Sequence, residues 1–155
     1  MSFNITPPPS EMDKRDEVLA KAYKNLIYFG RAFLPNDFLK KSESAPFHYE
    51  MGQKMIDTRP GARICNIIPR GHGKSVVAKA AIMHKLCFAA DDQQHFIAWV
   101  SEEQSQAIDH LKYIRSHFEN NKMIRYYFGN MDGGSVGKRW TEKDLVTPKG
   151  DRVIS

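Results

Sequence analysis

The sequence predicts an α/β fold in which a parallel sheet is flanked by helices. Two short apolar runs with the character of buried strands, residues 62–68 and 95–100, are each followed by a segment of helical periodicity. This alternation of strand and helix is typical of parallel sheets, because parallel neighbours need a crossover connection and a helix usually supplies it. A glycine-bearing turn directly after the first run gives a more specific fold class.

That turn, residues 69–75, reads Pro-Arg-Gly-His-Gly-Lys-Ser. A strand, a loop that ends in Gly-Lys-Ser and a helix are the context of a phosphate-binding P-loop. In such a loop, backbone amides and the helix N-terminus bind phosphate, Lys74 reaches the β- and γ-phosphates, and the Ser75 hydroxyl ligates Mg²⁺. The sequence therefore predicts a P-loop NTPase domain.

One position departs from the pattern G-x-x-x-x-G-K-[ST], because Ile68 stands where the first glycine is expected. The alternative interpretation is a glycine-rich turn that only joins a strand to a helix. The candidate nucleotide-binding residues of the loop are Pro69, Arg70, Gly71, His72, Gly73, Lys74 and Ser75.

Composition limits the class of protein. A chain of 155 residues is long enough for one domain, and no apolar run approaches the roughly 18 residues of a membrane span. The start has neither a basic n-region nor an apolar h-region, so we expect a cytosolic protein that is not secreted, with Cys65 and Cys87 as buried thiols. The net charge of +5 favours a polyanionic partner.

We expect two parts: residues 1–45, an extended Pro-rich arm and one amphipathic helix that ends near Leu34, and residues 46–155, the nucleotide-binding part. The second part opens with a short helix from Pro46 to about Thr58. In many nucleotide-binding motors the segment just before the P-loop strand packs on the base. His48 or Gln53 of this helix is therefore a candidate for base contact, and a packed histidine with a solvent-facing glutamine is the other interpretation.

The helix after the P-loop is predicted to cover the sheet with one stripe of side chains: Ala78, Ala81, Ile82, Leu86 and Ala89. Asp91 and Asp92 follow that helix directly, so we assign them to a solvated turn and not to a Mg²⁺-binding strand end. Ser101 and Gln104 form a predicted capping box for the next helix, which turns Ala107, Ile108, Leu111, Ile114 and Phe118 inward.

The last third of the chain is predicted to hold a short aromatic helix, a flexible loop and a β-hairpin. Gly137-Lys138 in the loop is not a second P-loop, because no strand precedes it and no helix follows it. Lys138, Arg139 and Lys143 lie beside Trp140, a combination suited to nucleic acid. The alternative is an exposed basic loop that keeps the hairpin soluble.

Three segments together resemble a known family: residues 69–75, Pro46-Phe47-His48-Tyr49-Glu50 before them, and Ser101-Glu102-Glu103-Gln104-Ser105 after the second strand. They are similar to the N-terminal ATPase domain of the large terminase subunit of tailed bacteriophages, over roughly residues 30–155. That family tolerates a P-loop without the first glycine and carries an arginine where Arg70 stands.

The resemblance implies an ASCE/RecA-like ATPase, with ATP and Mg²⁺ as ligands, that pumps double-stranded viral DNA into a capsid in the cytoplasm of the infected bacterium. It assigns catalytic roles to Lys74 and to Arg70, which contacts the γ-phosphate or transmits its loss. It further implies a portal protein, a small terminase subunit and a ring of copies as partners. The family's acidic strand end and nuclease domain are not visible in the sequence, so we expect an incomplete sheet and nucleotide binding without turnover.

Two other classes remain open at this point. One is another P-loop enzyme, such as a helicase-like ATPase or a small-molecule kinase. A kinase needs a lid and an acceptor site, and a helicase needs a second motor lobe. The other is a non-catalytic nucleotide-binding module.

Overall fold

The computed structural model describes residues 9–38, 43–57, 59 and 61–155, with residues 9–13 as backbone only. The part of the predicted arm that comprises residues 1–8 lies outside the described residues, as does Thr58. Over the described chain the helices are α1 (Pro9–Lys24), α2 (Leu26–Phe33), α3 (Pro46–Ile56), α4 (Lys74–Cys87), α5 (Gln104–Asn120) and α6 (Lys122–Phe128), with a 3₁₀ helix at Gly133–Val136. The strands are β1 (Phe96–Ala98), β2 (Asp144–Val146) and β3 (Arg152–Ile154).

The predicted α/β class is confirmed, and the sheet is small and mixed. Its strand order is β1-β3-β2, with β1 parallel to β3 and β2 antiparallel to β3. The parallel pair is not the predicted one, because residues 62–68 were expected beside residues 95–100 and β3 stands there instead, whereas β2 with β3 forms the predicted hairpin. The prediction of a wholly parallel sheet is therefore correct only in part. No helix among the described residues is long and apolar enough to cross a membrane.

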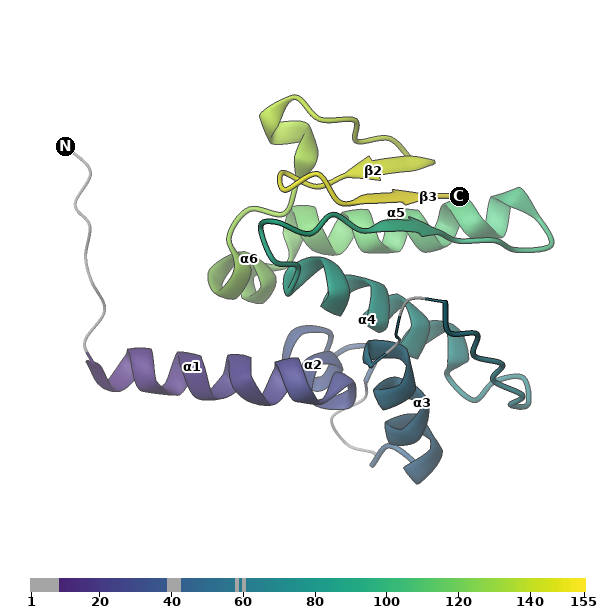
Figure 1. The fold of residues 1–155 in the computed structure, drawn as a ribbon, viewed down its shortest axis with the longest axis horizontal. Coiled ribbons are helices and arrows are strands. Elements are labelled where there is room, and N and C mark those ends of the chain that lie inside the picture. The colour runs from purple at the N-terminus through teal and green to yellow at the C-terminus, as the bar shows by residue number, and fades with distance from the viewer. Residues whose placement is uncertain (1–8, 39–42, 58, 60) are drawn as a thin grey trace.

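Helix α4 lies between two layers, with α2 and α3 on one side and α5 with the sheet on the other (Figure 1). A helix enclosed in this way buries residues around most of its circumference. Ala81 and Leu86 of the predicted stripe are buried, but Ala78 and Ile82 are only half-buried. The one-sided stripe was therefore wrong for α4, whose other buried side chains are Val77, Ala80, Met83, His84 and Cys87.

The single first helix predicted from periodicity is two helices in the structure. Asn25 interrupts it, adopts an extended conformation, and accepts a hydrogen bond from the Tyr28 amide through its side chain at 3.0 Å. Asparagine is a strong N-cap, so it starts a new helix at Leu26. The new direction lets α2 bury Leu26, Phe29 and Phe33.

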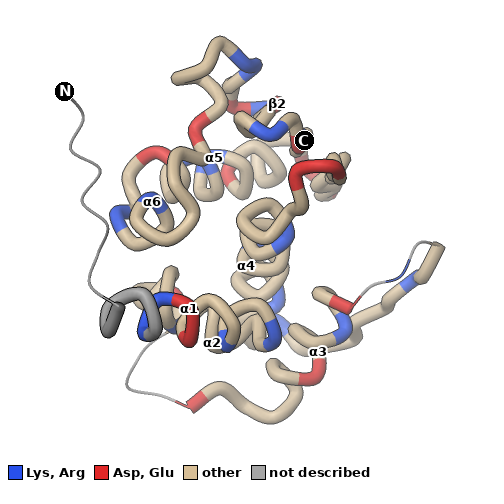
Figure 2. The backbone as a smooth tube through the Cα atoms, turned by 60° about the vertical axis from the view of Figure 1, so that its left-hand side comes forward, with Lys and Arg blue, Asp and Glu red and all other residues tan. Residues whose placement is uncertain are grey.

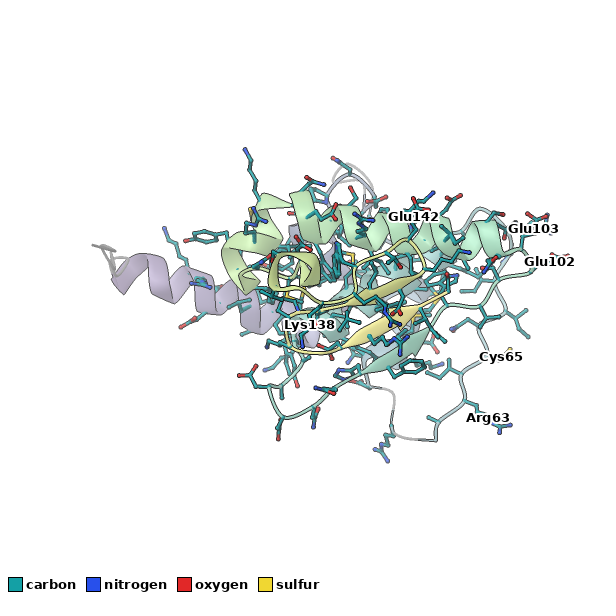
Figure 3. All side chains as sticks on the ribbon, turned by 90° about the horizontal axis from the view of Figure 1, so that it is seen from above. Arg63, Cys65, Glu102, Glu103, Lys138 and Glu142 are labelled. Carbon is teal, nitrogen blue, oxygen red and sulfur yellow. The ribbon has the colours of Figure 1, made fainter. Side chains whose placement is uncertain are left out.

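The apolar run at residues 62–68 was predicted as a buried strand, and this prediction is wrong for the structure. The run is extended but belongs to no strand, and Ile67 is 92% exposed. A strand needs a neighbour to accept its backbone hydrogen bonds, and the described part of the chain offers this run none. Cys65 is accordingly exposed instead of buried, on a segment that stands away from the body of the molecule (Figure 3).

Two further expectations about the strand at residues 95–100 need correction. Only Phe96–Ala98 pair in the sheet, and Phe96 is 65% and Val100 87% exposed, because one edge of β1 carries no strand among the described residues. The predicted capping box does not form either. Helix α5 starts two residues later than expected, with Glu103 at its N-cap, and the Ser101 hydroxyl accepts a hydrogen bond from the Trp99 indole at 3.2 Å.

An aromatic cluster joins α2, the end of α4 and α6 around His84. The His84 ring packs against Phe29, Phe88 and Tyr23. Its Nε2 lies 3.1 and 3.0 Å from the carbonyl oxygens of residues 22 and 23, which only accept, so Nε2 carries the proton and donates. Burial, which outweighs the two carbonyl contacts, lowers the pKa of His84, so the imidazole is neutral in the core.

Candidate nucleotide-binding site

The loop before α4 is curled by two glycines. Gly71 has φ 81° and Gly73 has φ 73°, both in the left-handed region that disfavours residues with a Cβ. Gly73 is the N-cap of α4, so the free amides of the first helical turn begin where the loop ends. The helix N-terminus and the loop amides together provide partial positive charge for an anion.

Lys74 ties the two ends of this loop together. Its Nζ donates to the carbonyl oxygen of Ile68 and, at 2.8 Å, to that of Pro69. The ammonium therefore lies at the N-terminal end of the loop, although the Lys74 backbone starts the helix. Residues 70–76 line a cavity of about 430 Å³, and Arg70 and Ser75 of this set are exposed.

Two histidines hold the outer side of the loop. The His48 Nδ1 accepts a hydrogen bond from the Ala45 amide at 3.1 Å, and its Nε2 lies 2.9 Å from the His72 carbonyl oxygen. The His72 Nδ1 in turn lies 2.8 Å from the Arg70 carbonyl oxygen. Helix α3 is thereby attached directly to the loop before α4.

A second cavity, of about 370 Å³, adjoins the first and shares Gly71, His72, Gly73 and Val76 with it. Its walls are mostly apolar, and its size suits part of a small ligand. Asp37 and Glu43 face it and bring carboxylate acceptors. Together, the two cavities have room for a polyphosphate at the loop and an attached planar group beside it. The second cavity is further lined by Ile27, Phe38, Ser44, Ala45, Phe47, His48 and Val77.

The structure separates the two candidates for base contact. His48 lines the second cavity, and both of its ring nitrogens are hydrogen-bonded to the main chain. Gln53 lies one to two turns further along α3, donates to Asp57 at 2.8 Å, and lines other hollows that contain no P-loop residue.

For a Mg²⁺ ion bound with nucleotide, the loop offers one protein oxygen, the exposed Ser75 hydroxyl, and phosphate and water would supply the other ligands. Among the described residues no group of three or more His, Cys, Asp or Glu is placed to hold a metal. Asp91 and Asp92 lie in an exposed turn, as predicted, beyond the far end of α4 and about 20 Å from Ser75 by helix rise. Asp144 accepts from Arg139 and Arg152.

The candidate DNA residues lie at the hairpin and the loop before it. Lys138 and Lys143 are exposed, and Figure 3 shows Lys138 on that loop. The Arg139 guanidinium pairs with Asp144 at 2.9 Å. The Trp140 indole donates to Glu119 at 2.8 Å, and its ring packs on Phe118. Among the described residues, neither Lys138 nor Lys143 forms an ion pair. The loop itself contains an ordered 3₁₀ helix at Gly133–Val136.

Sequence reasoning missed a polar cluster between α4, α5 and the segment after α2. The Tyr113 hydroxyl donates to Asp37 at 2.6 Å, and the Lys79 Nζ lies 3.7 Å from the centre of the Tyr113 ring. Burial and the Asp37 carboxylate raise the pKa of Tyr113, and burial lowers that of Lys79. These residues are far apart in sequence and match no motif, so no local signal could have found them.

Comparison of the chain with protein-family models, with curated proteins and with solved structures gives no match. The functional interpretation therefore depends on the loop geometry, on the two adjoining cavities, and on the resemblance carried by the three sequence segments.

Proposed function

We propose that the chain is the ATP-binding part of a phage DNA-packaging motor, a large terminase subunit that couples ATP hydrolysis to the translocation of double-stranded viral DNA. The observation that carries the proposal is the curled loop at the N-terminus of α4, with left-handed Gly71 and Gly73 and with Lys74 across its mouth. The conformation of the loop and its Gly-Lys-Ser sequence both support the interpretation that the loop binds phosphate. A P-loop ATPase fold is part of the proposal.

Each loop residue has a role that follows from its chemistry. The Lys74 ammonium exchanges its two carbonyl contacts for β- and γ-phosphate oxygens, and the Ser75 hydroxyl donates an oxygen ligand to Mg²⁺. The ion, when bound, offsets negative charge on the phosphates. Arg70 is exposed at the edge of the loop, where its planar fork can hold the γ-phosphate with two parallel hydrogen bonds.

The proposed partners are double-stranded DNA, the portal protein, the small terminase subunit and further copies in a ring, and the proposed location is the host cytoplasm. The positive net charge supports a polyanionic partner. Figure 2 shows lysine and arginine distributed over α1, α4, α6 and the region of β2 instead of on one element. We therefore assign DNA contact to two exposed cations, Lys138 and Lys143. Arg139 is a further candidate, and its guanidinium also forms an ion pair with Asp144.

Arg70→Ala is expected to weaken binding of a non-hydrolysable ATP analogue about tenfold and to leave ADP affinity within a factor of about two, because only the γ-phosphate offers the fork a partner. Calorimetric titration in the presence of Mg²⁺ measures both affinities. Arg63→Ala, which removes an exposed arginine from the nearby extended segment, is the matched control. Equal weakening for both nucleotides would show that Arg70 is a general phosphate contact. Absence of nucleotide binding by the unaltered chain would refute the proposed function.

DNA binding is expected to weaken with salt, and the double variant Lys138→Ala/Lys143→Ala is expected to reduce the salt slope of log K by about two, because each phosphate contact contributes about 0.9. Fluorescence anisotropy of a labelled duplex between about 50 and 200 mM salt measures this slope. The control, Lys14→Ala/Lys24→Ala, removes two exposed lysines from α1. An unchanged slope in the hairpin variant would place the DNA elsewhere.

A further inference from the structure

The protonation of His48 is determined by its two partners. The Ala45 amide is a donor, so Nδ1 must accept and carries no proton. The hydrogen of the neutral ring is then on Nε2, which faces the His72 carbonyl, a group that only accepts. Both ring nitrogens are thus used by the main chain, and His48 has no polar atom left for a base in the adjoining cavity.

The contact with His72 fixes the orientation of one peptide group. In a trans peptide the C=O of one residue and the N–H of the next point in opposite directions. With the His72 carbonyl directed toward His48, the Gly73 amide is directed away from α3. His48 lines only the second cavity and Gly73 lines both, which leaves the cavity formed by residues 70–76 available to an amide directed away from His48.

A second peptide group of the loop is oriented in the same way. The His72 Nδ1 donates to the Arg70 carbonyl at 2.8 Å, which directs the Gly71 amide to the opposite side. Gly71 and Gly73 both have left-handed φ and are free to rotate into other conformations, so their peptide orientations need such partners. Side chains on the outer side of the loop therefore orient its amides.

We propose that His48 is a positioning residue that keeps the Gly73 amide directed at the phosphates through its hydrogen bond to the His72 carbonyl, and that it does not read the base. This inference rests on the proposed nucleotide-binding function and assigns His48 a role in that same site. Space is consistent with it, since a Cβ built on Gly73 would lie 3.4 Å from the His48 Nε2. The loop and α3 thus meet at this histidine without an intervening side chain.

Two substitutions of His48 each remove one of its two hydrogen bonds and can retain the other. His48→Asn places an oxygen near the Nδ1 position and can accept from Ala45, but it does not reach His72. His48→Gln is longer and can donate from its amide to the His72 carbonyl, while the bond to Ala45 is lost. The probes are Mg²⁺ with inorganic tripolyphosphate, which has no base, and Mg²⁺ with a non-hydrolysable ATP analogue. Thermal melting of each variant measures folding separately from binding.

The expected result is a loss of about tenfold in affinity for both probes in His48→Asn, and affinities within about threefold of the unaltered chain in His48→Gln. A loss confined to the ATP analogue would overturn the inference in favour of base contact, and so would unchanged affinity for both probes in His48→Asn. Failure of the unaltered chain to bind either probe would instead refute the proposed function.

The role of His48 can also be tested on the unaltered chain, in case a variant does not fold. Long-range ¹H–¹⁵N spectra of the histidine rings report which nitrogen carries the proton. The expected form for His48 is the neutral ring protonated on Nε2, retained when tripolyphosphate is added. A ring protonated on Nδ1, or a tautomer change on adding the ATP analogue but not tripolyphosphate, would overturn the inference.

Discussion

Lys74→Ala is expected to weaken binding of Mg²⁺ and a non-hydrolysable ATP analogue at least about 100-fold, a change of about 2.7 kcal/mol in binding free energy. The ammonium is the cation held at the mouth of the loop, by the carbonyl oxygens of Ile68 and Pro69. Its removal takes away a charge-assisted contact to the phosphates and also releases the two ends of the loop from each other. Calorimetric titration measures the affinity.

The matched control for this substitution is Lys85→Ala, which removes the same charge from the last turn of the same helix, away from the loop. We expect its affinity to remain within a factor of about two of the unaltered chain, because charges separated from the loop by most of a helix are largely screened by salt. Unchanged affinity in a folded Lys74→Ala protein would mean that the loop is structural and that the P-loop interpretation is wrong.

Phe29→Ala is expected to lower the free energy of unfolding by about 3–5 kcal/mol, the range for deleting a fully buried phenyl ring. Phe29 has 0% of its surface exposed and contacts the rings of Phe33, His84, Phe88 and Phe128. These neighbours belong to three elements of the core, so the cavity cannot close by a local movement. Urea denaturation followed by circular dichroism measures the loss.

Phe96→Ala deletes the same ring from β1, where it is 65% exposed, and is the comparison for Phe29→Ala. We expect a loss below about 1 kcal/mol there, because most of that ring is already in water. Equal losses at the two positions would contradict the assignment of Phe29 to the centre of the core.

Helices α3 and α5 and the hairpin could be predicted because their signals are local. Pro46 marked the start of α3, the period of apolar residues marked α5, and Pro148-Lys149-Gly150-Asp151 marked the turn between β2 and β3. The prediction of a strand at residues 62–68 was wrong for a different reason. The apolar side chains of this run are compatible with a strand. Whether a neighbouring strand is available for backbone pairing depends on the whole fold, and the local sequence does not determine it.

The same distinction applies to the candidate site. The proposed phosphate-binding loop is contiguous, so its glycines, Lys74 and Ser75 could be named as candidates from spacing alone. The attachment of His48 to residue 72 spans 24 positions and that of Tyr113 to Asp37 spans 76, and no pattern in the sequence relates such pairs. Sequence reasoning therefore named His48 but not what it touches.

The enclosure of α4 between two layers has a mechanical consequence. A helix of 14 residues is a rod of about 20 Å, and this rod carries the loop at one end and packs into the aromatic cluster near the other. Between them, the Lys79 ammonium lies over the Tyr113 ring of α5. Because α4 packs against both layers, a tilt of the helix at its loop end would have to be accommodated by side chains of both layers.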